Sequence, residues 1–258
     1  MRKAQSRIIF SPKSHMNRYF ITLQYDGTNF HGWQVQPNGI TVEACIERAL
    51  STLLGEPADI VGAGRTDAGV HARKMVAHFD TERDVDCQQL VYKLNRMLPK
   101  DIAILDVKPV ADDMHARFSA KRRTYHYYIH TRKDAFLRNY SCLITFPLDI
   151  DKMNEAAEVL KEYNDFGAFC KSHTDVKTTL CEIYEAKFTI LSPYSIEFTI
   201  TANRFLRNMV RAVVGTLVDV GRGRLSLDGL RQIIEGKSRC DAGESMPANA
   251  LFLDEIEY

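Results

Sequence analysis

The sequence lacks the patterns that mark several large classes of protein. No uninterrupted apolar run approaches the ~20 residues that a membrane-spanning helix needs. The six cysteines form no C-x-x-C pair and fit no zinc spacing, and the eight histidines are scattered. Neither a Walker-type phosphate loop nor a dinucleotide-binding glycine pattern is present. We therefore expect no membrane span, no metal and no nucleotide cofactor, and a chain with reduced cysteines in the cytoplasm.

The N-terminal segment lacks the apolar centre of a secretory signal, although it is basic. We expect residues 1–16 to be a disordered leader or a tag, because 14–16 read Ser-His-Met, which cloning can leave behind. The remaining length allows one large domain or two modest ones with ample core.

A strong excess of positive charge is also absent, because 34 Lys and Arg residues face 33 Asp and Glu residues. Two stretches are nevertheless basic: seven cations and one acid lie between residues 117 and 138, and five arginines and one acid between 204 and 224. Such clustering can present a cationic cleft to phosphates, but charges dispersed over solvated faces would give the same composition. Composition alone leaves these two interpretations about equal.

Hydrophobic periodicity divides the chain into two halves of related order. The first half is predicted to contain a strand at 17–26, a helix at 41–54, strands at 58–63 and 70–80, a helix at 87–98 and a strand at 102–107. The second is predicted to contain a strand at 124–129, a helix at 151–163, strands at 181–189 and 195–202, helices at 208–220 and 226–235, and a strand at 250–258. Residues 136–147 are expected to be an irregular insertion, and 236–250 a mobile loop. These patterns predict an α+β fold in which two related antiparallel sheets join and the helices lie on one side.

Residues 62–72 combine ionisable side chains with small neighbours and read Gly-Ala-Gly-Arg-Thr-Asp-Ala-Gly-Val-His-Ala. Glycines before and after Asp67 allow a tight turn and a close approach to another molecule. Arg65 lies two residues before Asp67, so on an extended segment both face one side. An arginine there keeps the carboxylate ionised, able to act as base, nucleophile or electrostatic stabiliser. An isolated Arg-x-Asp is more often a structural ion pair on a surface loop, but the glycines and the following Val-His-Ala favour a site.

This run closely resembles the catalytic motif of the tRNA pseudouridine synthase A family, which reads Gly-Arg-Thr-Asp-x-Gly-Val-His-Ala. Residues 25–34 resemble the first strand and turn of that family, and 116–125 and 203–211 resemble its other two active-site segments. The resemblance covers residues 17–258. It implies two ferredoxin-like or RRM-like halves, 17–112 and 113–258, with the active cleft between them.

The resemblance also implies an activity: isomerisation of uridine to pseudouridine in the anticodon arm of tRNA, at tRNA positions 38, 39 and 40. It implies a homodimer that needs no cofactor and no metal. Asp67 corresponds to the nucleophile, which would attack either C6 of uracil or C1′ of ribose. Tyr125 corresponds to the tyrosine that packs on the target base, and Arg211 to the arginine paired with the nucleophile. Arg65 and Leu251 are expected to contact the substrate, and the phosphate contacts are expected from Arg122, Arg123, Arg204 and Arg207.

Several residues have a second interpretation. Without the resemblance, a cross-strand aromatic would be the favoured interpretation of Tyr125, since strands are rich in aromatic residues and two more tyrosines lie nearby. Arg211 can lie on the polar face of an ordinary amphipathic helix, but in an apolar helix a buried arginine needs an acid partner, for which Asp67 is the candidate. His71 is expected to be structural and Trp33 to be a packing residue.

The chain departs from the family at two positions: Ala250 stands where a glycine is usual, and Cys181 where many members carry arginine. Three rival functions stay open at this point. They are a non-catalytic RNA-binding protein, a carboxylate-dependent hydrolase, which would need a second acid, and a sister enzyme that modifies other RNAs.

Overall fold

The computed structural model describes residues 16–171 and 177–258, and its N-terminal part is built from four strands and two α-helices. In chain order these are β1 (Asn17–Tyr25), α1 (Val42–Leu54), β2 (Val61–Gly62), β3 (His71–Thr81), α2 (Cys87–Met97) and β4 (Ile102–Val110).

The C-terminal part adds five strands and three α-helices within the described residues. They are β5 (Arg122–His130), β6 (Cys142–Leu143), α3 (Ile150–Leu160), β7 (Ile183–Ser192), β8 (Ser195–Ala202), α4 (Met209–Gly221), α5 (Leu227–Gly236) and β9 (Leu251–Glu257).

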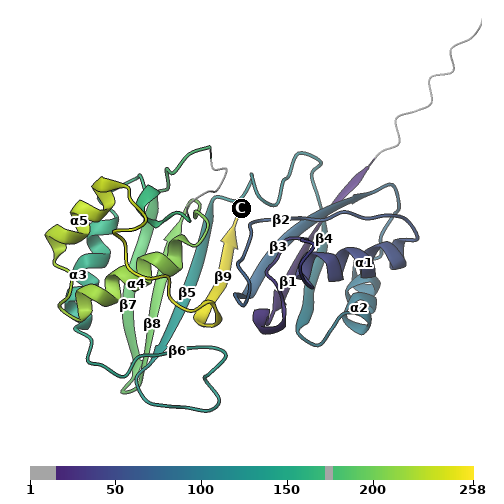
Figure 1. Cartoon of the computed structure of the whole chain (residues 1–258). Helices are drawn as coiled ribbons and strands as arrows, with labels where there is room; N and C mark the ends of the chain where they lie inside the picture. The colour runs from purple at the N-terminus through teal and green to yellow at the C-terminus, as the bar shows by residue number, and fades with distance from the viewer. Residues whose placement is uncertain (1–15, 172–176) are drawn as a thin grey trace, which may run out of the picture.

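All these strands join in one mixed sheet that extends through both parts (Figure 1). The order is β4-β1-β3-β9-β5-β8-β7, with β2 beside β3 and β6 beside β5. Neighbours are antiparallel except for β3–β9 and β5–β6. With the short β6 set aside, each part has its last strand beside its first, followed by its third and second. The α+β sheet predicted from the sequence is therefore present.

The C-terminal strand β9 makes the joint between the two parts (Figure 1). Its parallel pairing with β3 covers only two residue pairs, His71 with Phe252 and Ala72 with Leu253. Two side-chain ion pairs add to this short contact, Arg73 with Asp254 at 3.1 Å and Lys74 with Glu255 at 2.9 Å. The backbone pairing alone is thus a small part of what holds the two parts in register.

Local signals in the sequence set the helix ends. Helix α1 begins after Thr41, whose side chain accepts the Ala44 N–H at 3.3 Å, and ends at Gly55 in the left-handed region, φ +69°. Helix α5 begins after Ser226, which caps the Gly229 N–H. Thr41 and Gly55 are residue types that favour a helix start and a helix stop.

The strand expected at 58–63 is almost wholly replaced by irregular chain, since β2 holds two residues only. The backbone N–H groups of Ala58 and Ile60 donate to the side chains of Ser51 and Glu47 on α1. Those donors are therefore not available to a neighbouring strand. The other predicted elements differ from the observed ones by a few residues at their ends.

Strand β5 shows how the sheet separates two faces. Arg123, Tyr125 and Tyr127 are buried on one face, whereas His126 and Tyr128 on the other are partly exposed. Helix α4 is apolar around nearly its whole circumference, and eleven of its 13 residues are buried.

None of the described helices is long and apolar enough to cross a bilayer. The leader expected at 1–16 lies outside the described residues except for Met16.

Candidate active site

Asp67 lies on the turn between β2 and β3, with its side chain 28% exposed. The Val70 N–H donates to the Asp67 carbonyl oxygen at 3.1 Å and so closes the turn. Gly69, two residues after Asp67, has φ +80°, a conformation in which a side chain would be strained. The glycine therefore permits the turn that presents the carboxylate.

Two hydroxyl groups support this turn from the inside. The hydroxyl of the buried Thr66 lies 2.8 Å from that of Tyr25 on β1, and the Thr66 carbonyl accepts the Trp33 N–H at 3.3 Å. Burial raises the pKa of the Tyr25 phenol, so this hydroxyl stays protonated at neutral pH. Neither Tyr25 nor Thr66 was expected at the site from the sequence, although the place of Thr66 inside the motif is a signal that could have identified it.

Arg211, in the first turn of α4, reaches across to the Asp67 carboxylate. Its Nη1 lies 3.4 Å from Asp67 Oδ2, and its side chain is 21% exposed. Its Nε donates to the Met246 carbonyl oxygen at 2.6 Å. Arg207 Nε lies 3.9 Å from Asp67 Oδ1, and this second arginine is 58% exposed. The pairing of Arg211 with Asp67 that the sequence analysis expected is present, and Arg207 joins it.

The chain that carries Met246 is fastened along α4, and we call residues 242–246 the strap. The Met246 N–H donates to the Arg211 carbonyl at 3.1 Å, and the Gly243 N–H donates to the Thr216 hydroxyl at 2.9 Å. A Cβ on Gly215 would lie 1.9 Å from the Glu244 carbonyl oxygen, so only glycine allows this approach. The mobile loop expected at 236–250 is therefore tied down in this segment, and it holds the Arg211 guanidinium.

Tyr125 is 8% exposed on the buried face of β5, with its ring edge-on to Phe205 at 5.0 Å. Burial raises the pKa of its phenol to about 12; the nearby Arg123 cation opposes this rise and the Asp67 carboxylate adds to it. Tyr125 and Asp67 therefore share one electrostatic environment, although they come from different parts of the chain.

Arg65 does not pair with Asp67, although its position two residues before Asp67 suggested that it would. Its side chain is exposed, and the ion pairs recorded for Asp67 are with Arg211 and Arg207 instead. The expected pairing of Arg65 with Asp67 is wrong, and the premise of an extended strand at 65–67 does not hold, because no strand includes these residues. An exposed cation beside the motif stays available to a ligand.

The four arginines expected at phosphates differ in their surroundings. Arg123 is buried and donates to backbone carbonyls, so the prediction that it contacts phosphate is wrong. Arg122 is its neighbour on β5, so it faces the opposite side of the sheet from Tyr125; it pairs with Glu257 at 3.9 Å and lies over the Tyr184 ring. Arg204 and Arg207 both precede α4; Arg204 is partly exposed and Arg207 is exposed.

His71 and Trp33 are structural, as expected. The His71 Nδ1 accepts the Gly27 N–H at 3.0 Å, and its Nε2 therefore donates to the carbonyl oxygens of Asn139 and Asn249, at 3.0 and 3.1 Å. Trp33 is 2% exposed and packs near Tyr25.

The remaining predicted residues lie in the interior. Leu251, the first residue of β9, is 5% exposed opposite Tyr127 of β5. Ala250 and Cys181, the two departures from the family pattern, are buried.

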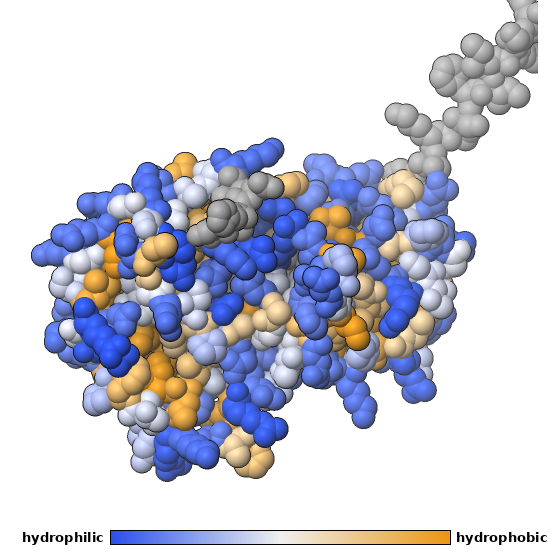
Figure 2. All heavy atoms as spheres, viewed as in Figure 1, coloured by the Kyte–Doolittle hydropathy of each residue, from blue (hydrophilic) through white to orange (hydrophobic). Residues whose placement is uncertain are grey.

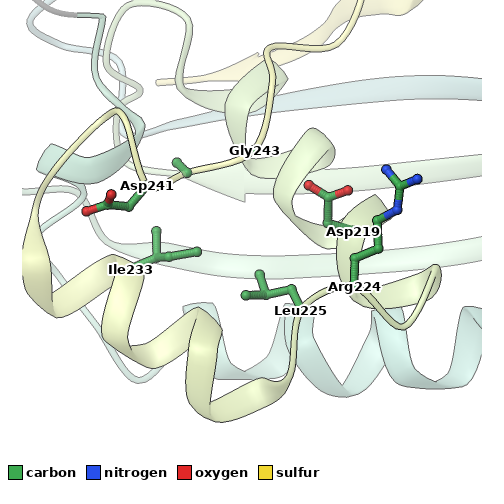
Figure 3. A pocket seen from close by; sticks show the side chains of 7 residues that line it. Asp219, Arg224, Leu225, Ile233, Asp241 and Gly243 are labelled. Atoms are coloured by element: carbon green, nitrogen blue, oxygen red, sulfur yellow. The ribbon is translucent and has the colours of Figure 1, made fainter.

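A separate hollow lies away from this constellation, against the far end of α4 (Figure 3). It is lined by Asp219, Arg224, Leu225, Ile233, Asp241, Ala242 and Gly243. Ala242 and Gly243 of the strap line it, but Asp67, Tyr125, Arg207 and Arg211 do not. Within the described part of the chain, no group of three or more His, Cys, Asp or Glu residues could hold a metal ion.

Comparison with known proteins identifies the family of the chain. The family model described as tRNA pseudouridine synthase matches residues 21–119 and 156–258. A protein named tRNA pseudouridine synthase A from Bacteroides fragilis is 56% identical over 244 residues, 94% of this chain and 97% of that protein. A protein of the same name from Parabacteroides distasonis is 56% identical over 246 residues, 94% of this chain and 96% of that protein. A solved CRISPR endoribonuclease Cse3 bound to RNA matches 80% of this chain and 97% of that one, at 13% identity and a TM-score of 0.22, which carries no argument.

The chain therefore belongs to the tRNA pseudouridine synthase family, a family of isomerases. Among the proteins of this family, it is similar over nearly its whole length to those named tRNA pseudouridine synthase A.

Proposed function

We propose that this chain isomerises uridine to pseudouridine in the anticodon arm of tRNA, at the positions named above, with Asp67 as the nucleophile. The observation that carries the proposal is the placement of Asp67, presented on a turn with the Arg211 guanidinium at 3.4 Å. The charged groups recorded as ion pairs of Asp67 are both arginines. A glycoside hydrolase would instead need a second carboxylate within about 5–10 Å.

The reaction breaks the bond between C1′ and uracil N1, turns the base, and joins C1′ to C5. The C5 proton is lost and N1 gains one, so atoms balance without a redox change. The Asp67 carboxylate would form a bond to C6 of uracil or to C1′ of ribose and leave again in the last step. Arg211 would orient this carboxylate, because its guanidinium is itself fixed by the Met246 carbonyl.

We propose that Tyr125 stacks on the target base. Its ring lies on the same sheet face as Arg123, close enough to Asp67 for the carboxylate to raise its pKa further. Aromatic stacking would offset the cost of flipping the base out of the anticodon arm, a few kcal/mol. Leu251 at the start of β9 would complete the apolar lining of this pocket.

We propose that Arg65, Arg204 and Arg207 meet the RNA. Arg65 and Arg207 are exposed next to Asp67, and Arg204 precedes Arg207 on the same segment. Hydrophilic side chains cover most of the face seen in Figure 2, with hydrophobic ones in smaller patches on both parts. A polar surface with local cations suits phosphate contacts, although the net charge of the chain is only +1.

We propose two ferredoxin-like domains, 17–112 and 113–258, and a cytoplasmic homodimer. The strand order supports the two domains, because it is the same in both parts when β6 is set aside. In each part the last strand lies beside the first, and the third and second follow. One protein chain of this length is expected to have a radius of gyration of about 18 Å. A tRNA is much longer than that, so a second subunit would extend the contact with it. No disulfide is recorded for the cysteines, in line with a reducing compartment.

Mass-spectrometric mapping of pseudouridine in tRNA from cells lacking the gene tests this function. The expected result is loss of pseudouridine from the anticodon arm, restored by the wild-type gene and not by Asp67→Ala. Loss confined to another RNA would favour the sister-enzyme alternative. Unchanged pseudouridine, with tRNA binding by the purified protein, would favour a non-catalytic RNA-binding protein.

A further inference from the structure

Arg123 occupies the boundary between the two parts of the molecule. It is 9% exposed at the start of β5, with Tyr125 two residues further on the same face. Its Nη2 donates to the carbonyl oxygens of Ala63 at 2.9 Å and Arg117 at 2.8 Å, and its Nη1 donates to the Asn203 carbonyl at 2.8 Å. One guanidinium therefore bonds three separate segments of the chain.

The hydrogen-bond partners recorded for this cation are all carbonyl oxygens, with no carboxylate among them. A buried charge that lacks an acid partner is costly, and burial lowers the pKa of the Arg123 guanidinium from its ordinary value. An apolar side chain would fill the space without that cost. Positions that break a local rule in this way are expected at functional or strained sites.

Two of the three segments that Arg123 joins lead to functional groups. Ala63 stands four residues before Asp67, and its own N–H donates to the Val76 carbonyl of β3 at 2.8 Å. Asn203 stands eight residues before Arg211, and it is anchored to Glu182 by a backbone bond and by its side chain. Both ends of the connection are therefore themselves fixed.

The strand pairing between the two parts of the molecule is short, because β3 and β9 pair over only two residue pairs. A planar guanidinium holds its acceptors in a fixed fork, which a lysine ammonium cannot reproduce. The Arg123 guanidinium thus joins the chain that leads into the Asp67 turn to the chain that leads into the Arg207–Arg211 segment, in addition to the ion pairs of these arginines with Asp67.

We propose that Arg123 is a positioning residue of the active site, which sets the separation of the Asp67 turn from the Arg207–Arg211 segment and does not bind tRNA phosphate. The proposal rests on the proposed function of Asp67. It reassigns a residue whose place in the basic run 121–123 suggests an RNA contact.

The test compares Arg123→Lys with Arg207→Met, an exposed arginine beside Asp67. Single-turnover rates are measured at saturating tRNA and normalised to the fraction of protein that binds tRNA. We expect Arg123→Lys to lower this rate between about tenfold and 100-fold, as misplacement of reacting groups does. Its affinity for tRNA and the salt dependence of binding should match wild type. Arg207→Met should instead weaken binding and lower the slope of log K against log salt by about 0.9.

Two results would overturn the proposal. A lower salt slope for Arg123→Lys with an unchanged saturated rate would make Arg123 a phosphate contact after all. A wild-type saturated rate and affinity with a lower melting temperature would make it a tie for folding only. If Arg123→Lys does not fold, the test uses Asn203→Ala, which removes the side-chain bond between the receiving segment and the Glu182 N–H and leaves the backbone bond in place. This variant must show a rate loss in the same sense; an unchanged rate contradicts the proposal. Absence of pseudouridine formation by the wild type itself would instead remove the proposed function.

Discussion

Replacement of Tyr125 by phenylalanine separates two roles that one side chain could have. Phenylalanine keeps the aromatic face, which is worth ~1–3 kcal/mol of stacking per base. It removes the hydroxyl oxygen, which could take the C5 proton in the last step. Burial raises the pKa of this phenol to about 12. At pH 8 only about one molecule in 10,000 would therefore carry the ionised, basic form, and this fraction rises tenfold for each unit of pH below 12.

We predict that Tyr125→Phe still breaks the glycosidic bond but releases the isomerised product slowly. A positioned base contributes roughly 100- to 10,000-fold, so loss of the C5 proton should slow by that order. The assay is a single turnover with tRNA tritiated at uracil C5, which follows loss of the label. Tyr125→Leu serves as the comparison, because it removes the face as well and should impair the earlier, base-positioning step. Tritium release by Tyr125→Phe at the wild-type rate would refute the role as base and leave stacking alone.

Three further predictions concern the surroundings of Asp67 and the assembly. Arg211→Ala should lower both the catalytic rate and the free energy of unfolding, the latter by about 1–3 kcal/mol, since the pair is neither exposed nor fully buried; denaturant unfolding with wild-type stability would contradict this. Thr216→Val removes the acceptor of the Gly243 N–H and should cost about 1 kcal/mol and lower kcat without weakening tRNA binding; an unchanged kcat would show that the strap does not position Arg211. Light scattering should give a dimer at micromolar concentration, and a monomer would count against the proposed assembly.

Much of the fold follows from local signals in the sequence. Alternating and helical spacing predicted most strands and all five α-helices of the described residues to within a few residues, and Thr41 and Gly55 mark the two ends of α1. The short β6 was missed, because it lies in the segment 136–147 that was expected to be irregular. The strand at 58–63 was wrong because side chains of α1 accept its backbone donors, a contact between elements that periodicity does not contain. The place of β9 between β3 and β5 depends on how the two parts pack, which no local signal contains.

The site divides in the same way. The motif around Asp67 carried its own signal, and the apolar character of α4 correctly predicted that Arg211 needs an acid partner. The basic run 121–123 was misleading, because alternation along β5 puts Arg123 on the buried face and Arg122 on the other. Thr66, Tyr25 and the strap act through contacts with residues distant in sequence, so only the folded chain brings them to the site.

The account depends most on Asp67, and one measurement tests it directly. Purified Asp67→Asn and Asp67→Ala are incubated with tRNA, and pseudouridine is quantified by mass spectrometry, with binding measured on the same preparations. We predict no pseudouridine with either variant and tRNA affinity close to wild type, because phosphate contacts carry most of the binding. Measurable turnover by Asp67→Ala would contradict the central claim that this carboxylate is the nucleophile.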